Sequence, residues 1–203
     1  MTSRREFLNI SLVVSAVPLV AHAARATALT RDARDDGLHD VVPLYKVLYD
    51  VRFPASVAFA RRAAEQGAAT QAMAGDVTSL WYNDLYHRWA QGPAGIAGLT
   101  ARGALFCLER LAWDQRLRVV FRSEHTLTAT GSMAHELSGP AALLPAACRA
   151  AAAVTWPAGM ADIVLQCPAG RVVAATARAT GANSGGHEPG PESLFSWVIA
   201  PWR

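Results

Sequence analysis

Residues 44–67 carry the sequence LYKVLYDVRFPASVAFARRAAEQG, which begins an alternation of expected strands and helices. Its first part, Leu44 to Asp50, is a short apolar run that ends in a charge, which predicts a β-strand. A helix is expected from Pro54 to Gln66, because proline is favoured in the first helical turn and small apolar residues recur on one face. Gly67 is a stop signal for that helix. The stretch therefore predicts a strand followed directly by a helix.

The same alternation of strand and helix continues as far as Arg122. Strands that alternate with helices at this spacing are typical of right-handed βαβ units around a parallel sheet. We therefore expect an α/β fold whose first half has a flavodoxin- or Rossmann-like layout. The further elements expected here are strands at Thr70–Met73, Ile96–Leu99 and Leu117–Arg122, a helix from Asp76 to Trp89, and a helix from Ala101 to Asp114.

The pattern changes after Arg122, where turn residues become more frequent and antiparallel pairing is expected. We expect one α/β domain over residues 41–203, built in three layers, with a parallel first half and an antiparallel, β-rich second half. Two subdomains that meet near Glu124 are the alternative. The expected elements are a hairpin of Thr126–Thr130 with Met133–Leu137, a helix within Pro140–Val154, a hairpin of Ile163–Gln166 with Arg171–Ala177, a loop at Thr180–Pro191 and a last strand at Leu194–Ile199.

Polar residues come after each of the four strands expected to be parallel. Ligands of open parallel sheets gather outside the carboxyl ends of the strands. We therefore expect a single polar crevice there, suited to an anionic or carbonyl-bearing ligand. The residues expected to bind that ligand are Arg52, Ser56, Asp76, Thr78, Thr100, Arg102 and Arg122.

His125 is the candidate general base of this crevice, with Glu124 beside it as the carboxylate that orients the imidazole. The alternative for the same set of residues is structural. Ser56, Asp76 and Thr100 are all residue types that cap helices. Arg52 and Arg122 can form ordinary surface ion pairs with Asp50 or Glu124.

Net charge and motif spacing argue against several classes of function. The chain has 203 residues, a formal net charge of +3 and no run of like charges, which argues against nucleic-acid binding. Metal-ligand spacings such as C-x-x-C and H-E-x-x-H do not occur, and neither does the G-x-S-x-G elbow of α/β-hydrolases. We expect no metal site, and no cofactor is identified. Cys148 and Cys167 are the more plausible disulfide pair among three cysteines, but their pairing stays open.

The first 23 residues have the features of a cleaved export signal. Ser3-Arg-Arg-Glu-Phe-Leu8 precedes an apolar run from Ile10 to Val20, and Ala21-His-Ala23 provides a small-x-small cleavage site. The run is too short to span a bilayer and contains Pro18, so we expect cleavage near Ala23 and no stable membrane span. Residues 24–40 are expected to form a flexible arm.

The motif S-R-R-x-F-L resembles the leader of the twin-arginine (Tat) export route. The resemblance implies export of the folded protein by the Tat translocase and a periplasmic location. Together with the dipeptide Trp81-Tyr82, the leader is also similar to that of small Tat-exported subunits of membrane-associated sugar and sugar-acid dehydrogenases. The mature chain resembles no characterised family.

Two functions therefore stand as expectations. The first is an exported periplasmic small-ligand-binding protein, or a small enzyme, with the crevice described above. The second is an accessory subunit co-exported with a periplasmic oxidoreductase, because the chain has a Tat-like leader but no cofactor motif of its own. The sequence identifies no substrate and does not decide between binding and catalysis.

Overall fold

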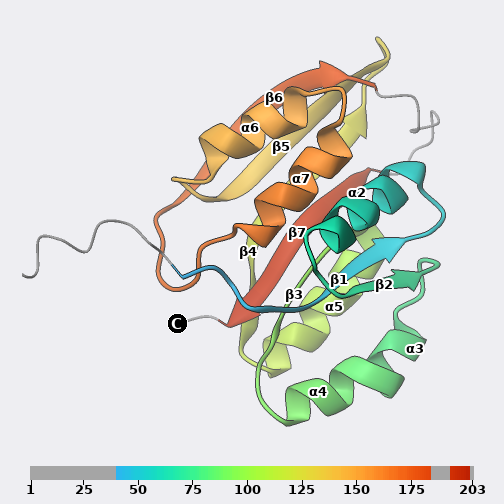
Figure 1. Ribbon diagram of the computed structural model, residues 1–203, viewed down its shortest axis with the longest axis vertical. Helices are drawn as coiled ribbons and strands as arrows, with labels where there is room; N and C mark the ends of the chain where they lie inside the picture. Colours follow the sequence, from blue (N-terminus) through green and yellow to red (C-terminus); the bar gives the residue numbers. More distant parts are fainter. Residues whose placement is uncertain (1–39, 184–192, 202–203) are drawn as a thin grey trace, which may run out of the picture. The chain divides into compact units, whose positions relative to one another are not determined.

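The computed structural model describes residues 40–183 and 193–201, which belong to one compact unit (Figure 1). The expected leader, residues 1–23, lies outside the described residues, as do residues 24–39 of the expected arm. In the described part of the chain no helix is long and apolar enough to cross a membrane.

One mixed sheet of seven strands organises this unit, in the order β2-β1-β3-β7-β4-β5-β6. β1 pairs in parallel with β2 and β3, whereas all pairings from β3 through β7 to β6 are antiparallel. The α/β class and the parallel start are thus confirmed. The strands are β1 (Leu44–Asp50), β2 (Thr70–Met73), β3 (Gly95–Ala101), β4 (Leu117–Leu127), β5 (Ser132–Pro140), β6 (Ala174–Ala182) and β7 (Leu194–Pro201).

The last strand of the chain, β7, lies between β3 and β4. β4 was expected to join the parallel strands, but it bonds to β7 and β5 instead. β3 and β4 still run in the same direction, because each is antiparallel to β7. Only the β2-β1-β3 start therefore fits the flavodoxin- or Rossmann-like layout.

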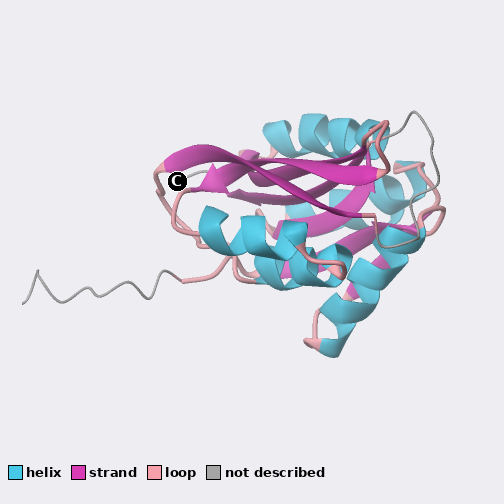
Figure 2. Ribbon diagram, turned by 90° about the horizontal axis from the view of Figure 1, so that it is seen from above, coloured by secondary structure: helices cyan, strands magenta, loops and turns pink. Residues whose placement is uncertain are grey.

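Helices lie on both sides of the sheet (Figure 2). On one side an apolar layer joins α2, α6 and α7 to the sheet through residues such as Phe59, Ala147 and Met160. On the other side a second apolar layer joins α3, η1, α4 and α5 to the sheet, through residues such as Leu85 and Leu108. The helical segments are α2 (Pro54–Glu65), α3 (Thr78–Leu80), the π-helical η1 (Trp81–Leu85), α4 (Tyr86–Ala90), α5 (Arg102–Asp114), α6 (Leu144–Ala152) and α7 (Trp156–Leu165).

The hairpin expected at Ile163–Gln166 is wrong, because these residues end helix α7. Their β-branched, apolar character suits a strand, but the preceding residues already set a helical period. Trp156, Met160 and Val164 recur every four residues and are all buried on one side. β6 begins only at Ala174 and extends into the region expected to be a loop.

Two other boundaries differ from the expectation. β4 continues beyond Arg122 to Leu127, because alternate residues face the core even where they are polar. The helix expected within Pro140–Val154 begins at Leu144, since Pro140 ends β5 and Pro145 occupies the first helical turn.

The second apolar layer leaves part of the sheet bare. It contains Leu117 and Val119 from the start of β4, but it includes no residue of β5 or β6. On the side away from α6 and α7, β5, β6 and the part of β4 beyond Val119 therefore have no described helix over them. We call this surface the open face; it carries Arg122, Glu124, Glu136, Ser138, Thr176 and Arg178.

Candidate functional site

The end of β1 is held by a compact polar cluster. Asp50 is fully buried, and both its carboxylate oxygens accept hydrogen bonds from the Arg52 guanidinium, at 2.9 Å from Nε and 2.6 Å from Nη2. The Ser56 hydroxyl accepts the Asp50 N–H at 2.8 Å and donates to the carbonyl of Leu99. Ser56 thus ties β1 to β3, and the buried carboxylate of Asp50 neutralises the Arg52 guanidinium.

Gly75 completes this cluster. Its φ is +82°, a conformation that favours glycine, and a Cβ there would lie 2.5 Å from Nη2 of Arg52. The glycine after β2 therefore lets the arginine lie close against the backbone. This packing supports a structural role for Arg52.

The residues after β2 and β3 do not join that cluster through any recorded hydrogen bond. Asp76 accepts the backbone N–H of Thr78 at 2.8 Å, and hydrogen bonding to the side chain and then the backbone of Thr78 holds the pKa of this carboxyl below its usual value. Thr100 is buried and accepts the Trp197 indole N–H at 3.0 Å. Arg102 is exposed at the start of α5. The expected crevice residues are thus distributed among separate local contacts.

His125 lies in the core, on the side covered by α6 and α7. Its Nδ1 is 2.7 Å from Nδ1 of His135, and its Nε2 is 2.9 Å from the Ser196 hydroxyl. The indole of Trp156 covers the ring of His125, with 4.3 Å between the two centroids. His125 and His135 are 0% and 1% exposed.

Glu124 does not orient His125, which corrects the expected catalytic pair. Neighbouring residues of a strand point to opposite faces. Glu124 therefore lies on the open face, while His125 lies beneath α7. The partner of His125 is His135, its register neighbour on β5. The expected hairpin of Thr126–Thr130 with Met133–Leu137 brought these strands together, but it began after His125 and implied another register, so it did not identify the pair.

Burial dominates the chemistry of the histidine cluster. It lowers the pKa of His135 to about 4, so this imidazole is neutral at pH 7. Within the described residues, Nε2 of His135 and the hydroxyl of Ser123 are buried without a hydrogen-bond partner. Ser196, His125 and His135 have the order of a nucleophile, a base and an orienting group. All three are fully covered, however, so this arrangement gives a substrate no access to Ser196.

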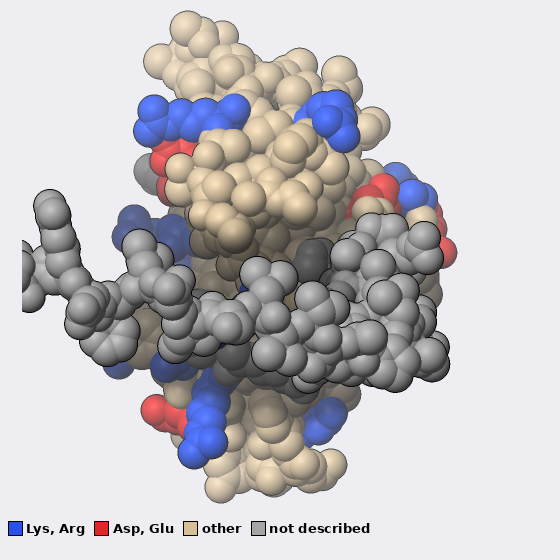
Figure 3. All heavy atoms as spheres, turned by 90° about the vertical axis from the view of Figure 1, so that its left-hand side faces the viewer, with Lys and Arg blue, Asp and Glu red and all other residues tan. Residues whose placement is uncertain are grey.

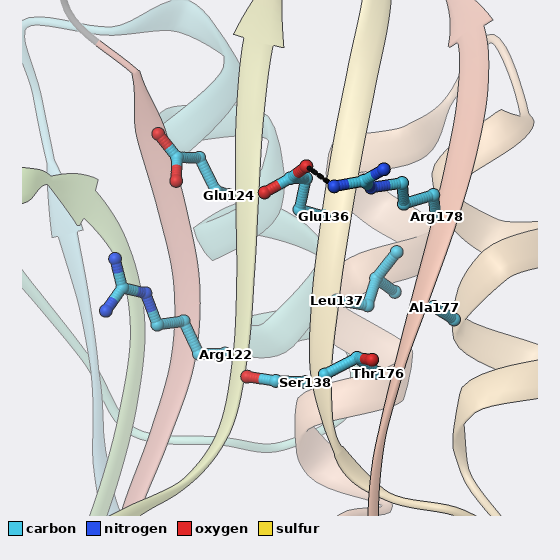
Figure 4. Close-up of a pocket in the computed structure, with 8 residues that line it drawn as sticks. All are labelled: Arg122, Glu124, Glu136, Leu137, Ser138, Thr176, Ala177 and Arg178. Atoms are coloured by element: carbon cyan, nitrogen blue, oxygen red, sulfur yellow. Dashed lines mark ion pairs between the residues drawn. The ribbon is translucent and has the colours of Figure 1, made fainter.

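The open face has the polar character expected of a ligand site (Figure 4). It lines a shallow hollow of about 710 Å³. Across the strands, Arg122 is level with Ser138 and Thr176. In the next row Glu124 is level with Glu136 and Arg178. Of the residues in these two rows, the sequence predicted only Arg122 and Glu124 as site residues. The others were missed because β6 was placed too early in the chain.

The charges of the open face are unevenly paired. Arg178 donates to Glu136 across 2.9 Å, whereas no ion pair among the described residues involves Arg122 or Glu124. Figure 4 shows the side chains of Arg122 and Glu124 extending from β4 toward β7, away from Glu136. The Arg122 guanidinium carbon lies 4.6 Å from the ring centroid of Phe195 on β7. A cation and a carboxylate are thus both accessible for a ligand.

A second hollow, of about 610 Å³, lies where β1 and β3 begin and β7 ends. Asp40, Tyr45 and Arg88 are its charged or polar side chains. The Tyr45 hydroxyl donates to Asp84 at 2.7 Å, and Arg88 lies over the Tyr45 ring. These groups already have partners, so this hollow is the weaker candidate.

Basic side chains do not gather on the surface shown in Figure 3, where they form small separate groups with acidic residues beside several of them. All three cysteines are free, and burial raises the pKa of the Cys167 thiol to about 12. No family model matches the chain, and comparison with curated proteins and with solved structures found no match. The proposed function therefore depends on the geometry of these sites and on the sequence motifs.

Proposed function

We propose that this chain is an exported periplasmic protein that binds a small, carboxylate-bearing ligand on the open face of β4, β5 and β6. The observation that carries the proposal is the Arg122 guanidinium. It stands in a polar hollow without a carboxylate partner among the described ion pairs. A guanidinium presents donors in a planar fork that matches a carboxylate. The leader motif Ser3-Arg-Arg-Glu-Phe-Leu8 supports export by the Tat route.

The neighbours of Arg122 suit the same ligand class. The hydroxyls of Ser138 and Thr176 occupy the same row and can donate to a bound carboxylate. Glu124, in the next row, can accept from an ammonium or hydroxyl group elsewhere on the ligand. Within this face no imidazole or thiol of the described residues stands beside the two hydroxyls. Binding is therefore the better-supported activity, rather than covalent catalysis.

The test is calorimetric titration of the full chain with acetate, succinate, citrate and glycine. Arg122→Gln removes the guanidinium but keeps a polar side chain. We expect at least one panel member to bind, and Arg122→Gln to weaken it tenfold or more, which is about 1.4 kcal/mol. The matched control is Arg149→Gln, an exposed arginine on α6 at the other side of the sheet. No binding to any of the four compounds, or equal affinity in Arg122→Gln, contradicts the proposal.

The second candidate is an accessory subunit co-exported with a redox enzyme. It is favoured by Tyr82 and Tyr86, which are 65% and 53% exposed on η1 and α4. Trp81 lies edge-on to Tyr86, with 5.6 Å between the ring centroids. Exposed aromatic side chains are enriched where proteins dock, and π-helical turns are frequent at functional positions.

Native purification from periplasm distinguishes this candidate. An accessory subunit elutes together with a flavoprotein or cytochrome partner. The combined substitutions Tyr82→Ser and Tyr86→Ser should then separate this chain from its partner. Val173→Ser is the control, because Val173 is a large exposed apolar residue just before β6, away from η1. Elution as a single chain, or a complex that survives the double substitution, counts against the accessory role.

A further inference from the structure

The histidine pair of β4 and β5 is a buried titratable group that ligand binding does not use. His125 and His135 face each other across the two strands and share one hydrogen bond between their Nδ1 atoms. Trp156 packs on both rings, with centroid distances of 4.3 Å to His125 and 5.5 Å to His135. Trp156 is the first residue of α7, so the pair lies under the corner where α6 leads into α7.

We propose that this pair is an acid-sensitive switch, which holds α6 and α7 on the sheet near neutral pH and releases them in mildly acidic surroundings. The proposal is independent of the ligand on the open face. It concerns the covered side of the same strands, where α7 lies in front of the sheet in Figure 1.

As neutral groups, the two rings can share this hydrogen bond in either of two complementary tautomers. If His125 donates from Nδ1, its Nε2 accepts from Ser196, and His135 carries its proton on Nε2. If His135 donates from Nδ1, the Nε2–H of His125 donates to Ser196 instead. In both tautomers Nε2 of His135 has no partner among the described residues. The hydrogen bond between the rings thus forms only while at least one Nδ1 is unprotonated.

Protonation of His135 is unfavourable inside this cluster. The first proton puts a positive charge into an apolar layer, at the cost of desolvation. A second proton places two N–H groups face to face at the 2.7 Å separation of the Nδ1 atoms, which breaks their hydrogen bond. Opening of the α6–α7 corner exposes the rings to water and removes both penalties.

The charged side chains of the described elements around His135 lie away from its ring. Asp162, the carboxylate of α7, is paired with Arg62 of α2 at 2.8 Å. Glu124, Glu136 and Arg178 lie on the open face, on the other side of the sheet. The remaining titratable groups of these elements are Cys148 and exposed Arg149 on α6 and Cys167 just after α7, while β7 contributes no titratable residue to this side.

The sign of the effect follows from proton binding. The closed state binds a proton at His135 with a pKa of about 4, and the open state with the ordinary value of about 6.5. Stability of the closed state is therefore complete above pH 6.5 and falls as the pH drops toward 4. Between pH 7.5 and pH 5, these two values favour opening by about 30-fold through His135 alone.

The test is hydrogen exchange of the full chain at pH 7.5 and pH 5, corrected for the intrinsic pH dependence of exchange. We expect amides of residues 144–165 to exchange about 30-fold faster at pH 5, while those of β1 and β3 change little. Replacing both rings by apolar groups, in His125→Phe with His135→Leu, should abolish the difference. His87→Gln, an exposed histidine on α4, should retain it.

An unchanged exchange rate in the wild type, or a difference that persists in the double variant, overturns the proposal. If the double variant does not fold, nitrogen NMR of the imidazoles in the wild type decides the question. The proposal requires the folded pair to stay neutral well below pH 6.5. Protonation of the folded pair at or above pH 6.5 overturns it.

Discussion

At the scale of single residues, most polar side chains at the strand ends serve local structure. Arg52 pairs with Asp50, and Asp76 accepts the Thr78 N–H, as the structural alternative expected from the sequence. Ser56 does not cap its helix; its hydroxyl joins β1 to β3 instead. Residue type alone predicts that such groups find partners, but the partner of Ser56 is 43 residues away.

Ser56→Ala tests this structural role. The substitution leaves the N–H of Asp50 and one acceptor position of Leu99 without the hydroxyl, in the core. Two buried groups that lose a partner destabilise the fold by about 2 to 4 kcal/mol in total. Urea unfolding of Ser56→Ala measures the loss, and Ser79→Ala, at an exposed serine of α3, is the control. Equal stability of the two variants contradicts the role assigned to Ser56.

The histidine pair shows why the expected pairing of His125 with Glu124 is wrong. His125 and Glu124 are neighbours in sequence, yet a strand places them on opposite faces. His125 instead contacts His135 and Ser196, ten and seventy-one residues away. The sequence therefore indicated a titratable side chain but not the environment in which it lies.

At the scale of elements, β1, α2 and β2 begin where the sequence predicts, because proline, glycine and apolar runs are local signals. β4 and α7 were misjudged for opposite reasons. β4 continues through polar residues whose burial depends on α7, and α7 contains a β-branched run inside a helical period. In both cases tertiary contacts override local preference.

Gly98 makes the close packing of β3 testable. A Cβ there would lie 2.6 Å from the backbone oxygen of Leu48 and 2.7 Å from the Trp197 indole. Gly98→Ala should therefore destabilise the fold by about 1 to 3 kcal/mol, because the backbone atom cannot move aside. Gly103 of α5 has open space around it, so Gly103→Ala should stabilise the helix by about 0.5 kcal/mol. Thermal unfolding compares the two, and equal shifts contradict the packing described here.

At the scale of the whole molecule, the insertion of β7 between β3 and β4 determines where ligands can bind. It separates the parallel strands from β4, β5 and β6, which extend the sheet beyond the helices of one side. This topology joins residues about a hundred positions apart, and no local pattern predicts such a pairing. The α/β class was therefore predictable, whereas the sheet order and the open face were not.

The central claim is that a small carboxylate binds on the open face and not at the ends of β1, β2 and β3. Amide NMR of the full chain, titrated with the tightest binder among acetate, succinate, citrate and glycine, tests it most directly. We expect amide chemical-shift changes at residues 122–124, 136–138 and 176–178, and we expect Arg122→Gln to abolish them. Changes centred on Arg52, Asp76 and Thr100 would contradict it and would place the ligand at the carboxyl ends of the parallel strands.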